Sequence, residues 1–495
     1  MTTYPVLGVD KPSLIHIIST SMKRILVILG VLTIGAVADD WPMFQHDPKH
    51  QGRSKEVGPG DTTSYWKVPF EAESRIWTSP IVGTIGNEVI VYIGTQNGRL
   101  YAINPTDSPQ VRWYYDTPPN AIRGIAVDRY GKVVYCGSNN DTLYPLDALT
   151  GSPLTWNYGA ENPISTPITL NGYNIYFGSY RCFHWLKNNG EVMCTYPLGD
   201  EVLNSCAPAV DDTGTMYFQS ASNLGGGATY FYALAEDGSE AWWLDIGGES
   251  SPSIGDNGVI YIGGKDGCIY GIKEGAIAYY KEIGTYITST PALGKDGRVY
   301  IGSDNGHIYC LSPTLDSIIW RYLTGGAIVG APVIDDAGNV YVGSTDGYLW
   351  SFTSEGHMRW KYKTSDPIRR SPAIGPKGII YVASGKYLYA IGKGTGIEEN
   401  LSKRLFRLRI LPNPFKGFSV ISFQLSARNT VSLEVCDIAG RLVKSLVKAR
   451  SLEPGSYKLR WDGRDERGEM VPEGIYFCKL FTPSFYTVEK MIMVR

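Results

Sequence analysis

Arginine is the residue type whose placement points most clearly to chemistry in this sequence. Four arginines stand just before the first strand of a repeated unit: Arg75, Arg123, Arg369 and Arg370. The guanidinium group offers a planar fork of N–H donors that matches a carboxylate or a phosphate, which the lysine ammonium cannot match in geometry. If the chain closes into a ring, the repeats that carry these arginines become neighbours. We therefore predict that the four side chains form a ligand-binding mouth for an anion.

Acidic residues hold comparable places in three other repeats: Glu161, Glu201 and Glu249. One mouth of the ring would then be positive on one side and negative on the other. The competing interpretation is that all of these residues are solvated loop charges, with the arginines partly neutralised by nearby acids: Glu71, Glu73 and Asp366. Exposed charges of that kind contribute little to binding or stability.

Histidine and cysteine form no pattern typical of a metal site. His46 and His50 flank Pro48, so they cannot share one regular helix face as a zinc-hydrolase pair would, and we expect them to pin the N-terminal segment. Three further histidines fall on separate repeats: His184, His307 and His357. The eight cysteines are scattered without C-x-x-C spacing, which favours neither a zinc site nor a disulfide framework. We predict no metal ligand and no catalytic residue.

The elements that position the arginines belong to an internal repeat. A small residue followed by proline recurs at Ser79-Pro80, Thr166-Pro167, Ala207-Pro208, Ser251-Pro252, Thr290-Pro291, Ala331-Pro332 and Ser371-Pro372, and Arg123-Gly124 fills the one missing place. Successive starts are 39 to 44 residues apart, close to the length of one four-stranded propeller blade. Eight starts predict an all-β, eight-bladed β-propeller.

Each repeat contains an apolar strand, a tight turn and an aromatic outer strand. The turns carry dipeptides that accept positive φ: Asn97-Gly98, Asp266-Gly267, Asn305-Gly306 and Asp346-Gly347. The outer strands carry Trp113, Trp156, Trp242, Trp320 and Trp360, with Cys194 and Tyr279 in the two weaker repeats. Because these aromatic residues recur at a fixed place, we expect them to pack between blades rather than to form a sugar-stacking platform.

The last repeat lacks an outer strand of its own, because the sequence after Ala390-Ile391 runs into Gly392. Upstream of the first repeat, Tyr65-Trp66-Lys67-Val68 resembles Trp360-Lys361-Tyr362 and has no other assignment. We predict that this N-terminal strand near Trp66 completes the eighth blade and closes the ring, which leaves no long sheet edge exposed. An open solenoid would leave the strand unexplained.

A resemblance to a known family adds to this pattern. The run from Leu146 to Gly151 followed by Trp156 resembles the tryptophan-docking motif of propellers with pyrroloquinoline-quinone-type (PQQ-like) repeats, and the segment Trp41 to Asp47 resembles the start of many exported members. The likeness covers about residues 41–392. That family includes both quinoprotein dehydrogenases and non-catalytic scaffolds. For the dehydrogenase, the resemblance implies a PQQ cofactor over a tryptophan floor, a calcium ion held by carboxylates and an amide, and an aspartate base; many such enzymes also have a vicinal cysteine pair, which this chain lacks.

The C-terminal part follows a different β pattern after a linker expected at residues 393–403. Its motifs are Leu411-Pro412-Asn413-Pro414-Phe415, Val431-Ser432-Leu433-Glu434-Val435, Asp437-Ile438-Ala439-Gly440-Arg441, Trp461-Asp462-Gly463 and Gly474-Ile475-Tyr476-Phe477. They resemble the flagellar-hook-cap-type immunoglobulin-like fold and, equally, the C-terminal sorting domain of type IX secretion, which also ends in a basic, apolar strand like residues 490–495. A plain β-sandwich spacer is the alternative. We assign residues 404–495 to a small immunoglobulin-like β-sandwich for sorting or attachment.

The N-terminus carries the features of an export signal. Lys23 and Arg24 precede an apolar run from Ile25 to Val37, and Ala36-Val37-Ala38 supplies the small residues of a cleavage site. We assign residues 1–38 to an upstream extension plus signal peptide and 39–392 to the propeller. The apolar run is shorter than the roughly 20 residues that span a bilayer, so no transmembrane segment is expected in the mature chain. No cysteine stands directly after the cleavage site, the first one being Cys136, which disfavours a lipid anchor.

Composition and repeats together favour binding over catalysis. Lys plus Arg total 46 against 48 for Asp plus Glu, so the basic footprint of a nucleic-acid-binding protein is missing. We predict an exported, non-catalytic propeller at the cell surface or, as second choice, in the periplasm. Its expected partners are a protein or anionic polymer at one face and secretion or envelope machinery at the C-terminal domain, and no cofactor is predicted. The alternatives are a PQQ-dependent oxidoreductase and a periplasmic scaffold for outer-membrane protein assembly.

Overall fold

The computed structural model describes residues 40–494, with gaps at 63–65, 67–68, 86–87, 107, 129–131, 199–200, 204–205, 223–228, 393–408, 426–428, 439–440, 454 and 483–484. The expected signal peptide and the expected linker therefore lie outside the described residues. Within them, the chain consists of strands and turns apart from one 3-10 turn, Pro376–Gly378. The all-β class predicted from the sequence is confirmed.

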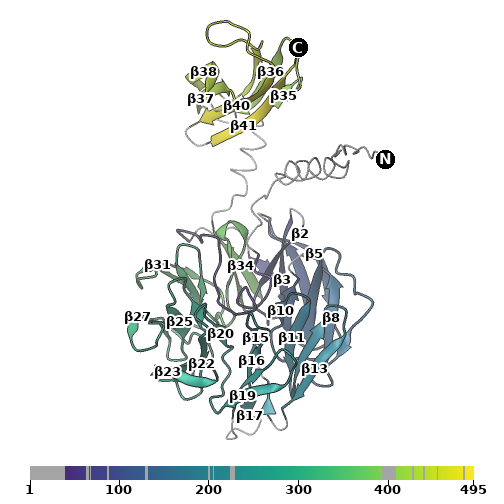
Figure 1. The fold of residues 1–495 in the computed structure, drawn as a ribbon, viewed down its shortest axis with the longest axis vertical. Coiled ribbons are helices and arrows are strands. Elements are labelled where there is room, and N and C mark those ends of the chain that lie inside the picture. Colours follow the sequence, from purple (N-terminus) through teal and green to yellow (C-terminus); the bar gives the residue numbers. More distant parts are fainter. Residues whose placement is uncertain are drawn as a thin grey trace, which may run out of the picture.

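Residues 70–391 form eight four-stranded antiparallel sheets among the described residues (Figure 1). The first four contain β2 (Ile81–Ile85), β3 (Glu88–Gly94), β4 (Arg99–Asn104) and β5 (Gln110–Asp116); β6 (Ile122–Val127), β7 (Val133–Ser138), β8 (Thr142–Asp147) and β9 (Tyr158–Gly159); β10 (Thr169–Asn171), β11 (Asn174–Ser179), β12 (Cys182–Lys187) and β13 (Val192–Pro197); β15 (Ala209–Val210), β16 (Met216–Gln219), β18 (Phe231–Leu234) and β19 (Glu240–Leu244). A short pair, β14 (Glu201–Val202) and β17 (Ala221–Ser222), accompanies the fourth sheet.

The next three sheets follow the same order. They contain β20 (Ser253–Ile254), β21 (Ile260–Gly263), β22 (Cys268–Lys273) and β23 (Ala276–Glu282); β24 (Ala292–Leu293), β25 (Val299–Gly302), β26 (His307–Leu311) and β27 (Ile318–Leu323); β28 (Val333–Ile334), β29 (Val340–Gly343), β30 (Tyr348–Phe352) and β31 (Met358–Lys363). The glycines of the predicted turns have the expected positive φ, for example 84° at Gly306 and 80° at Gly347. Each predicted repeat start leads into the first strand of one sheet.

The remaining sheet combines the two ends of this region, and we call it the composite sheet. It contains β32 (Ala373–Ile374), β33 (Ile380–Ser384), β34 (Tyr387–Ile391) and the N-terminal strand β1 (Phe70–Glu71). In β1, Phe70 lies opposite Leu388 and Glu71 opposite Tyr387.

The described part of the strand that pairs with β34 begins four residues after Trp66. Residues 65, 67 and 68 lie outside the described residues, whereas Trp66 is buried and packs against Tyr381 at 5.8 Å between ring centroids. The indole fills the interior beside the composite sheet, and the backbone pairs with β34 only four residues later. The N-terminal segment that the resemblance to Trp360 pointed to therefore supplies a strand of the composite sheet close to Trp66, and the pairing of residues 65, 67 and 68 stays a prediction.

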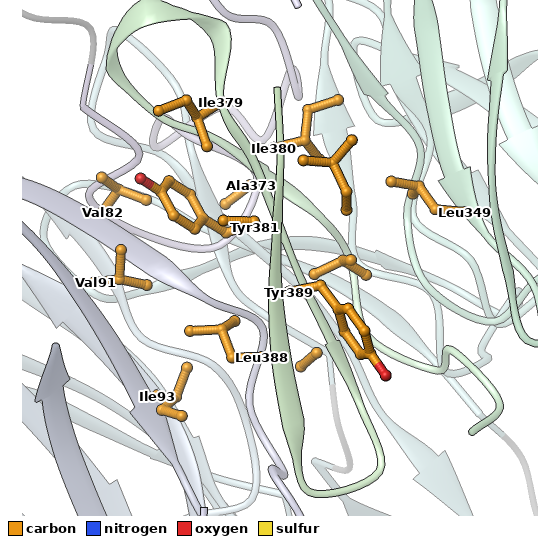
Figure 2. Close-up of a cluster of buried hydrophobic side chains, with 14 of the residues drawn as sticks. Val82, Val91, Ile93, Leu349, Ala373, Ile379, Ile380, Tyr381, Leu388 and Tyr389 are labelled. Atoms are coloured by element: carbon orange, nitrogen blue, oxygen red, sulfur yellow. The ribbon is translucent and has the colours of Figure 1, made fainter. Parts of the chain in front are cut away.

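Hydrophobic clusters lie between neighbouring sheets rather than within one. One cluster joins the composite sheet to the β2–β5 sheet (Figure 2). The β2–β5 sheet contributes Val82, Val91 and Ile93, and the composite sheet contributes Ala373, Ile380, Tyr381 and Leu388. The Ser371 N–H also donates to Ser79 Oγ at 3.2 Å. The first and last repeats are thus in direct contact.

Four of the predicted tryptophans lie on the fourth strand of a sheet and dock on the next repeat or on the N-terminal segment: Trp113, Trp242, Trp320 and Trp360. The Trp320 Nε1–H donates to the Ser354 carbonyl at 2.7 Å. Gly356 lies against the same indole with φ of 86°, where an added Cβ would come within 2.6 Å of the ring. This contact is the physical reason why a glycine stands at position 356, four residues before Trp360.

Trp156 does not lie on an outer strand, so that part of the prediction is wrong. It precedes β9, in which only Gly159 and Tyr158 pair with β8. Pro145 in β8 and Pro153 beside it have no N–H to donate, which prevents a longer ladder. The Trp156 ring nevertheless packs on Tyr135.

The C-terminal residues form two sheets around one core. The sheets contain β35 (Arg409–Leu411), β36 (Ser419–Leu425) and β39 (Gly455–Trp461); and β37 (Asn429–Cys436), β38 (Leu442–Leu452), β40 (Gly474–Thr482) and β41 (Phe485–Met493). Both contribute to a cluster that includes Ile421, Leu433 and Trp461. The Asn413 side chain binds the backbone of β41, donating to the Lys490 carbonyl at 2.6 Å and accepting from the Ile492 N–H at 2.8 Å.

Candidate anion-binding site

The floor of the candidate site is made by the N-terminal strap, which we define as residues 40–60. Carbonyls of the strap accept backbone N–H groups from the first strands of six different sheets: those of Val82, Val127, Val210, Ile254, Leu293 and Ile334. Each of these strands is the edge of its sheet and would otherwise leave unpaired donors. The Leu170 N–H of a seventh sheet meets Met43 Sδ at 3.4 Å.

The strap is held in a compact shape by its own side chains. Asp47 Oδ1 accepts the Lys49 N–H at 2.9 Å, and the buried His50 ring bonds the Pro252 carbonyl and Thr169 Oγ1 at 3.1 and 3.0 Å. Burial lowers the pKa of His50 to about 4, so the ring is neutral at ordinary pH. The expectation that His50 pins the N-terminal segment agrees with these contacts.

Above the strap lies one cavity of about 170 Å³, the arginine cavity, lined by residues from seven of the eight sheets and by Phe44 of the strap. Its lining is layered along the strands. Ile81, Ile125 and Phe44 line the floor. Hydroxyl groups form a belt at the repeat starts, namely Ser79, Ser251, Thr290 and Ser371. Charged groups and Trp77 line the region before those starts.

The hydroxyl belt also joins one sheet to the next. The Ala207 N–H donates to Ser251 Oγ at 2.9 Å, and the Ser251 N–H donates to Thr290 Oγ1 at 3.3 Å. The Ala331 N–H likewise donates to Ser371 Oγ at 2.9 Å. The hydroxyl residue before the proline therefore bonds neighbouring sheets at Ser79, Ser251, Thr290 and Ser371, which explains why the sequence repeats it.

The structure brings the four predicted arginines together. Arg123, Arg369 and Arg370 line the arginine cavity, and Arg75 lines an adjoining hollow of about 150 Å³ together with Arg369 and Arg370. Burial lowers the pKa of Arg123. Burial, followed by repulsion from the other three guanidiniums, lowers the pKa of Arg370 to about 10. The cluster is therefore a region of high positive potential.

Trp77 lies at the centre of the cluster, and the sequence analysis missed it. The guanidinium carbons of Arg123 and Arg370 lie 5.1 and 5.0 Å from its ring centroid. Its Nε1–H is buried without a hydrogen-bond partner among the described residues. Its place two residues before Ser79, and outside the outer-strand position of the repeat, could have drawn attention to it. From the sequence, only tryptophans at or resembling the outer-strand position were considered.

The acids named in the competing interpretation have other partners. Glu71 pairs with Lys386, and Glu73 pairs with Arg99 at 2.6 Å. Asp366 accepts a hydrogen bond from Ser365 Oγ at 3.0 Å. Among the described residues, none of the four arginines has an ion-pair partner within 4.0 Å. Arg123 instead donates to the neutral Asn139 side chain at 3.3 Å. Glu71 and Glu73 are therefore paired with cations outside the cluster.

Of the three glutamates expected on the other side of the mouth, one lines the cavity. Glu249 faces it together with Thr288. Glu161 is exposed and does not line it, and the side chain of Glu201 lies outside the described residues. The cavity is thus polarised, with several guanidiniums on one side and one carboxylate on the other.

The donor set does not fit the calcium and quinone site of the dehydrogenase alternative. That site requires several carboxylates and an amide around a hard cation, whereas Glu249 is the carboxylate that lines the cavity. Across the described part of the chain, no three His, Cys, Asp or Glu side chains are grouped as metal ligands. The same part contains no helix long and apolar enough to cross a membrane.

Comparisons with known proteins identify two family models in the chain. Residues 280–399 match the model described as outer membrane protein assembly factor BamB, and residues 413–480 match the FlgD Ig-like domain. No curated protein matches the chain significantly.

Solved structures are similar to the chain at the level of fold. BamB from Moraxella catarrhalis is 18% identical with a TM-score of 0.52, covering 66% of this chain and 98% of that one. The quinohemoprotein alcohol dehydrogenase from Comamonas testosteroni is 13% identical with a TM-score of 0.58, covering 88% and 82%. Sqt1 from Saccharomyces cerevisiae is 10% identical with a TM-score of 0.57, covering 68% and 99%. Together with the match of residues 280–399, these likenesses establish the fold, a β-propeller with PQQ-like repeats. They assign neither a catalytic nor a binding role to the chain.

Proposed function

We propose that this protein is an exported, non-catalytic binding module that holds an anionic group in the arginine cavity of a closed, eight-bladed propeller. One observation carries the proposal: Arg123, Arg369 and Arg370 line one cavity around Trp77 without a carboxylate partner among the described residues. Burying cations without counter-ions costs stability. A bound anion would remove that cost, so the site is suited to a ligand that supplies the negative charge.

The expected contacts are charge-assisted hydrogen bonds. Each contributes about 1.5–3 kcal/mol when desolvated and much less when exposed. Arg370 and Arg123 are partly buried, whereas Arg369 and Arg75 are exposed. We therefore assign most of the binding energy to Arg370 and Arg123, and assign to the exposed pair the attraction that brings the anion to the mouth.

Calorimetric titration with sodium acetate and with phosphate, at fixed ionic strength, tests this proposal. Arg369→Ala combined with Arg370→Ala should weaken binding at least tenfold, and raised sodium chloride should have the same effect on the wild type. Arg321→Ala is the matched control, because it removes an exposed arginine that does not line the cavity. Binding that is absent in the wild type, or unchanged in the double variant, would refute the proposal.

The division of labour within the chain is also proposed. Residues 39–392 would form the propeller, residues 393–403 the linker, and residues 404–495 an immunoglobulin-like module that sorts the protein to the cell surface or attaches it there. The match of residues 413–480 to the FlgD Ig-like model supports such a module. Removing residues 404–495 should leave the propeller folded but retain it in the periplasm. Surface display of the truncated protein, measured by protease accessibility on whole cells, would count against sorting.

The match to the BamB model supports a second candidate, a periplasmic scaffold for outer-membrane protein assembly. Such a scaffold would bind protein partners through a propeller face. Cross-linking in cells separates the two candidates: the scaffold predicts capture of outer-membrane assembly components that persists in the Arg369→Ala, Arg370→Ala variant. Loss of all captured protein in that variant would favour the anion site as the point of contact.

A further inference from the structure

We infer that the ligand of the arginine cavity is an amphipathic monocarboxylate, with its apolar group resting on Phe44 and its carboxylate held by the guanidiniums. This inference rests on the proposed function and names the ligand class. Its basis is the order of the lining residues from floor to mouth, together with the strap that blocks the far end.

The lining changes from charged to apolar along a single strand. Arg123 and Ile125 are two residues apart on β6, and both line the cavity. Because side chains on the same face of a strand alternate with period two, the guanidinium and the apolar side chain follow each other along the cavity wall. Ser79 and Ile81 repeat this order in the neighbouring sheet. A ligand that spans these layers needs one charged end and one apolar end.

The strap determines which end enters first. It carries Phe44 into the cavity floor, where the ring packs edge-on against His50 at 5.5 Å between centroids. Strap carbonyls bond the first strands of six sheets, so this floor is an integral part of the fold. With that end closed, a ligand enters through the arginine mouth, apolar group first, and its carboxylate stops at the guanidiniums. A long polymer cannot thread through.

The hydroxyl belt does not favour a carbohydrate. Its four oxygens, those of Ser79, Ser251, Thr290 and Ser371, already accept backbone N–H groups from the neighbouring sheet. A sugar would lose hydrogen bonds to water without regaining them in full, which is costly. An alkyl or aromatic group loses none and gains by leaving water.

The acidic side of the cavity sets the charge of the ligand. Glu249 lines the wall of the same cavity as the arginines, so a polyanion would bring a second negative charge toward it. A ligand with a single carboxylate meets the guanidiniums and leaves Glu249 unopposed. The polarised cavity therefore favours a monocarboxylate over an anionic polymer.

Two sources supply this chemistry: a free small acid and the C-terminal residue of a polypeptide with an apolar side chain. Titration with acetate, butyrate, hexanoate and 3-phenylpropionate tests the shared chemistry. Affinity should rise about fourfold per buried methylene, and 3-phenylpropanol, which lacks the charge, should bind at least tenfold more weakly than 3-phenylpropionate. A peptide that ends in phenylalanine, with a free or an amidated C-terminus, then separates the sources. Binding of the free form alone identifies a polypeptide terminus, and failure of both forms with retained hexanoate binding identifies a free acid.

The floor is tested with Phe44→Ala, which should weaken hexanoate at least tenfold and acetate less than twofold. Val57→Ala is the control, because Val57 is an exposed strap residue outside the cavity. Phe44→Leu keeps an apolar floor and should restore most of the hexanoate affinity even if Phe44→Ala lowers the melting temperature. Equal affinity for acetate and hexanoate, or tighter binding of alginate oligomers than of hexanoate, would overturn this inference and leave the anion site intact. Absence of binding by every carboxylate, with phosphate still bound, would also overturn this inference, whereas absence of phosphate binding as well would refute the proposed function.

Discussion

Replacing Arg370 by methionine should stabilise the unliganded protein while it weakens anion binding. Arg370 is partly buried, and its guanidinium faces repulsion from Arg123, Arg369 and Arg75. Methionine keeps the length and apolar stem of the side chain but removes the charge. A residue that serves ligand binding commonly costs stability in this way.

The magnitude follows from the pKa of Arg370, which lies at about 10 in the folded protein. Relative to an ordinary arginine, this lowered pKa disfavours the charged form by about 3 kcal/mol. The unfolded chain keeps the ordinary value, so this cost is fully present below pH of about 10 and declines only as the pH rises above it. The contact with Trp77, about 0.5–1 kcal/mol, is lost in the variant. The net expected gain in the free energy of unfolding is about 2 kcal/mol.

Urea unfolding at pH 7 and low salt, followed by tryptophan fluorescence, measures this gain. Arg321→Met is the control and should change the free energy of unfolding by less than about 0.5 kcal/mol, because Arg321 is exposed. Saturating carboxylate should stabilise the wild type by about 2.7 kcal/mol at 100 times Kd and the variant much less. If Arg370→Met destabilises the protein, the guanidinium is a structural group and the reasoning is refuted.

Three further predictions concern stability. The pKa of His50 is about 4 in the folded protein and about 6.5 in the unfolded chain, so only the unfolded chain binds the proton between these pH values. The free energy of unfolding should therefore fall by about 2–3 kcal/mol from pH 7 to 4.5. Urea unfolding of His50→Gln should show a smaller fall, and a pH profile identical to that of the wild type would contradict the assignment. In Gly124→Ala the new Cβ would lie 2.6 Å from the Thr166 carbonyl oxygen, so the free energy of unfolding should fall by about 1–3 kcal/mol. Gly159→Ala is the control: its new Cβ would have nothing within 4 Å, so the free energy of unfolding should hardly change. Trp66→Ala should lower the free energy of unfolding by about 3–5 kcal/mol. Trp243 is half-exposed, so Trp243→Ala should lower it by less than about 1 kcal/mol in the same measurement. Equal losses would mean that the N-terminal region does not anchor the composite sheet.

Features that repeat were predictable because each repeat places the same physical demand on its residues. Gly151, Gly275 and Gly356 recur because an indole from the preceding sheet lies where a Cβ at each of these positions would be. Thr290 and Ser371 recur because their hydroxyls accept an N–H from the adjoining sheet. Because each sheet needs the same glycine and hydroxyl contacts, these residues recur at regular intervals in the sequence. That regular spacing predicted where the strands lie.

Features that occur once had no period to reveal them. The strap binds seven sheets through backbone carbonyls and one sulfur, and a carbonyl acceptor carries no residue signature. Trp66 resembles a repeated tryptophan but is buried against Tyr381, so residue type alone could not fix its partner. Trp77 was overlooked because its role depends on Arg123 and Arg370, which are brought to it from other repeats.

The most informative signal in the sequence is the one repeat that breaks the pattern. Where the other repeats have a small residue and proline, this one has Arg123-Gly124. Gly124 lies so close to the Thr166 carbonyl that any side chain would collide, and this close approach holds the strand that carries Arg123 against the cavity. The other seven starts have serine, threonine or alanine at this position. The Arg123 guanidinium therefore lines the cavity at the level of the hydroxyl belt. Arg123 departs from the small residue found at the other starts, and it is accompanied by a second departure, Gly124 in place of proline. We attribute this pair of departures to the proposed anion site rather than to folding.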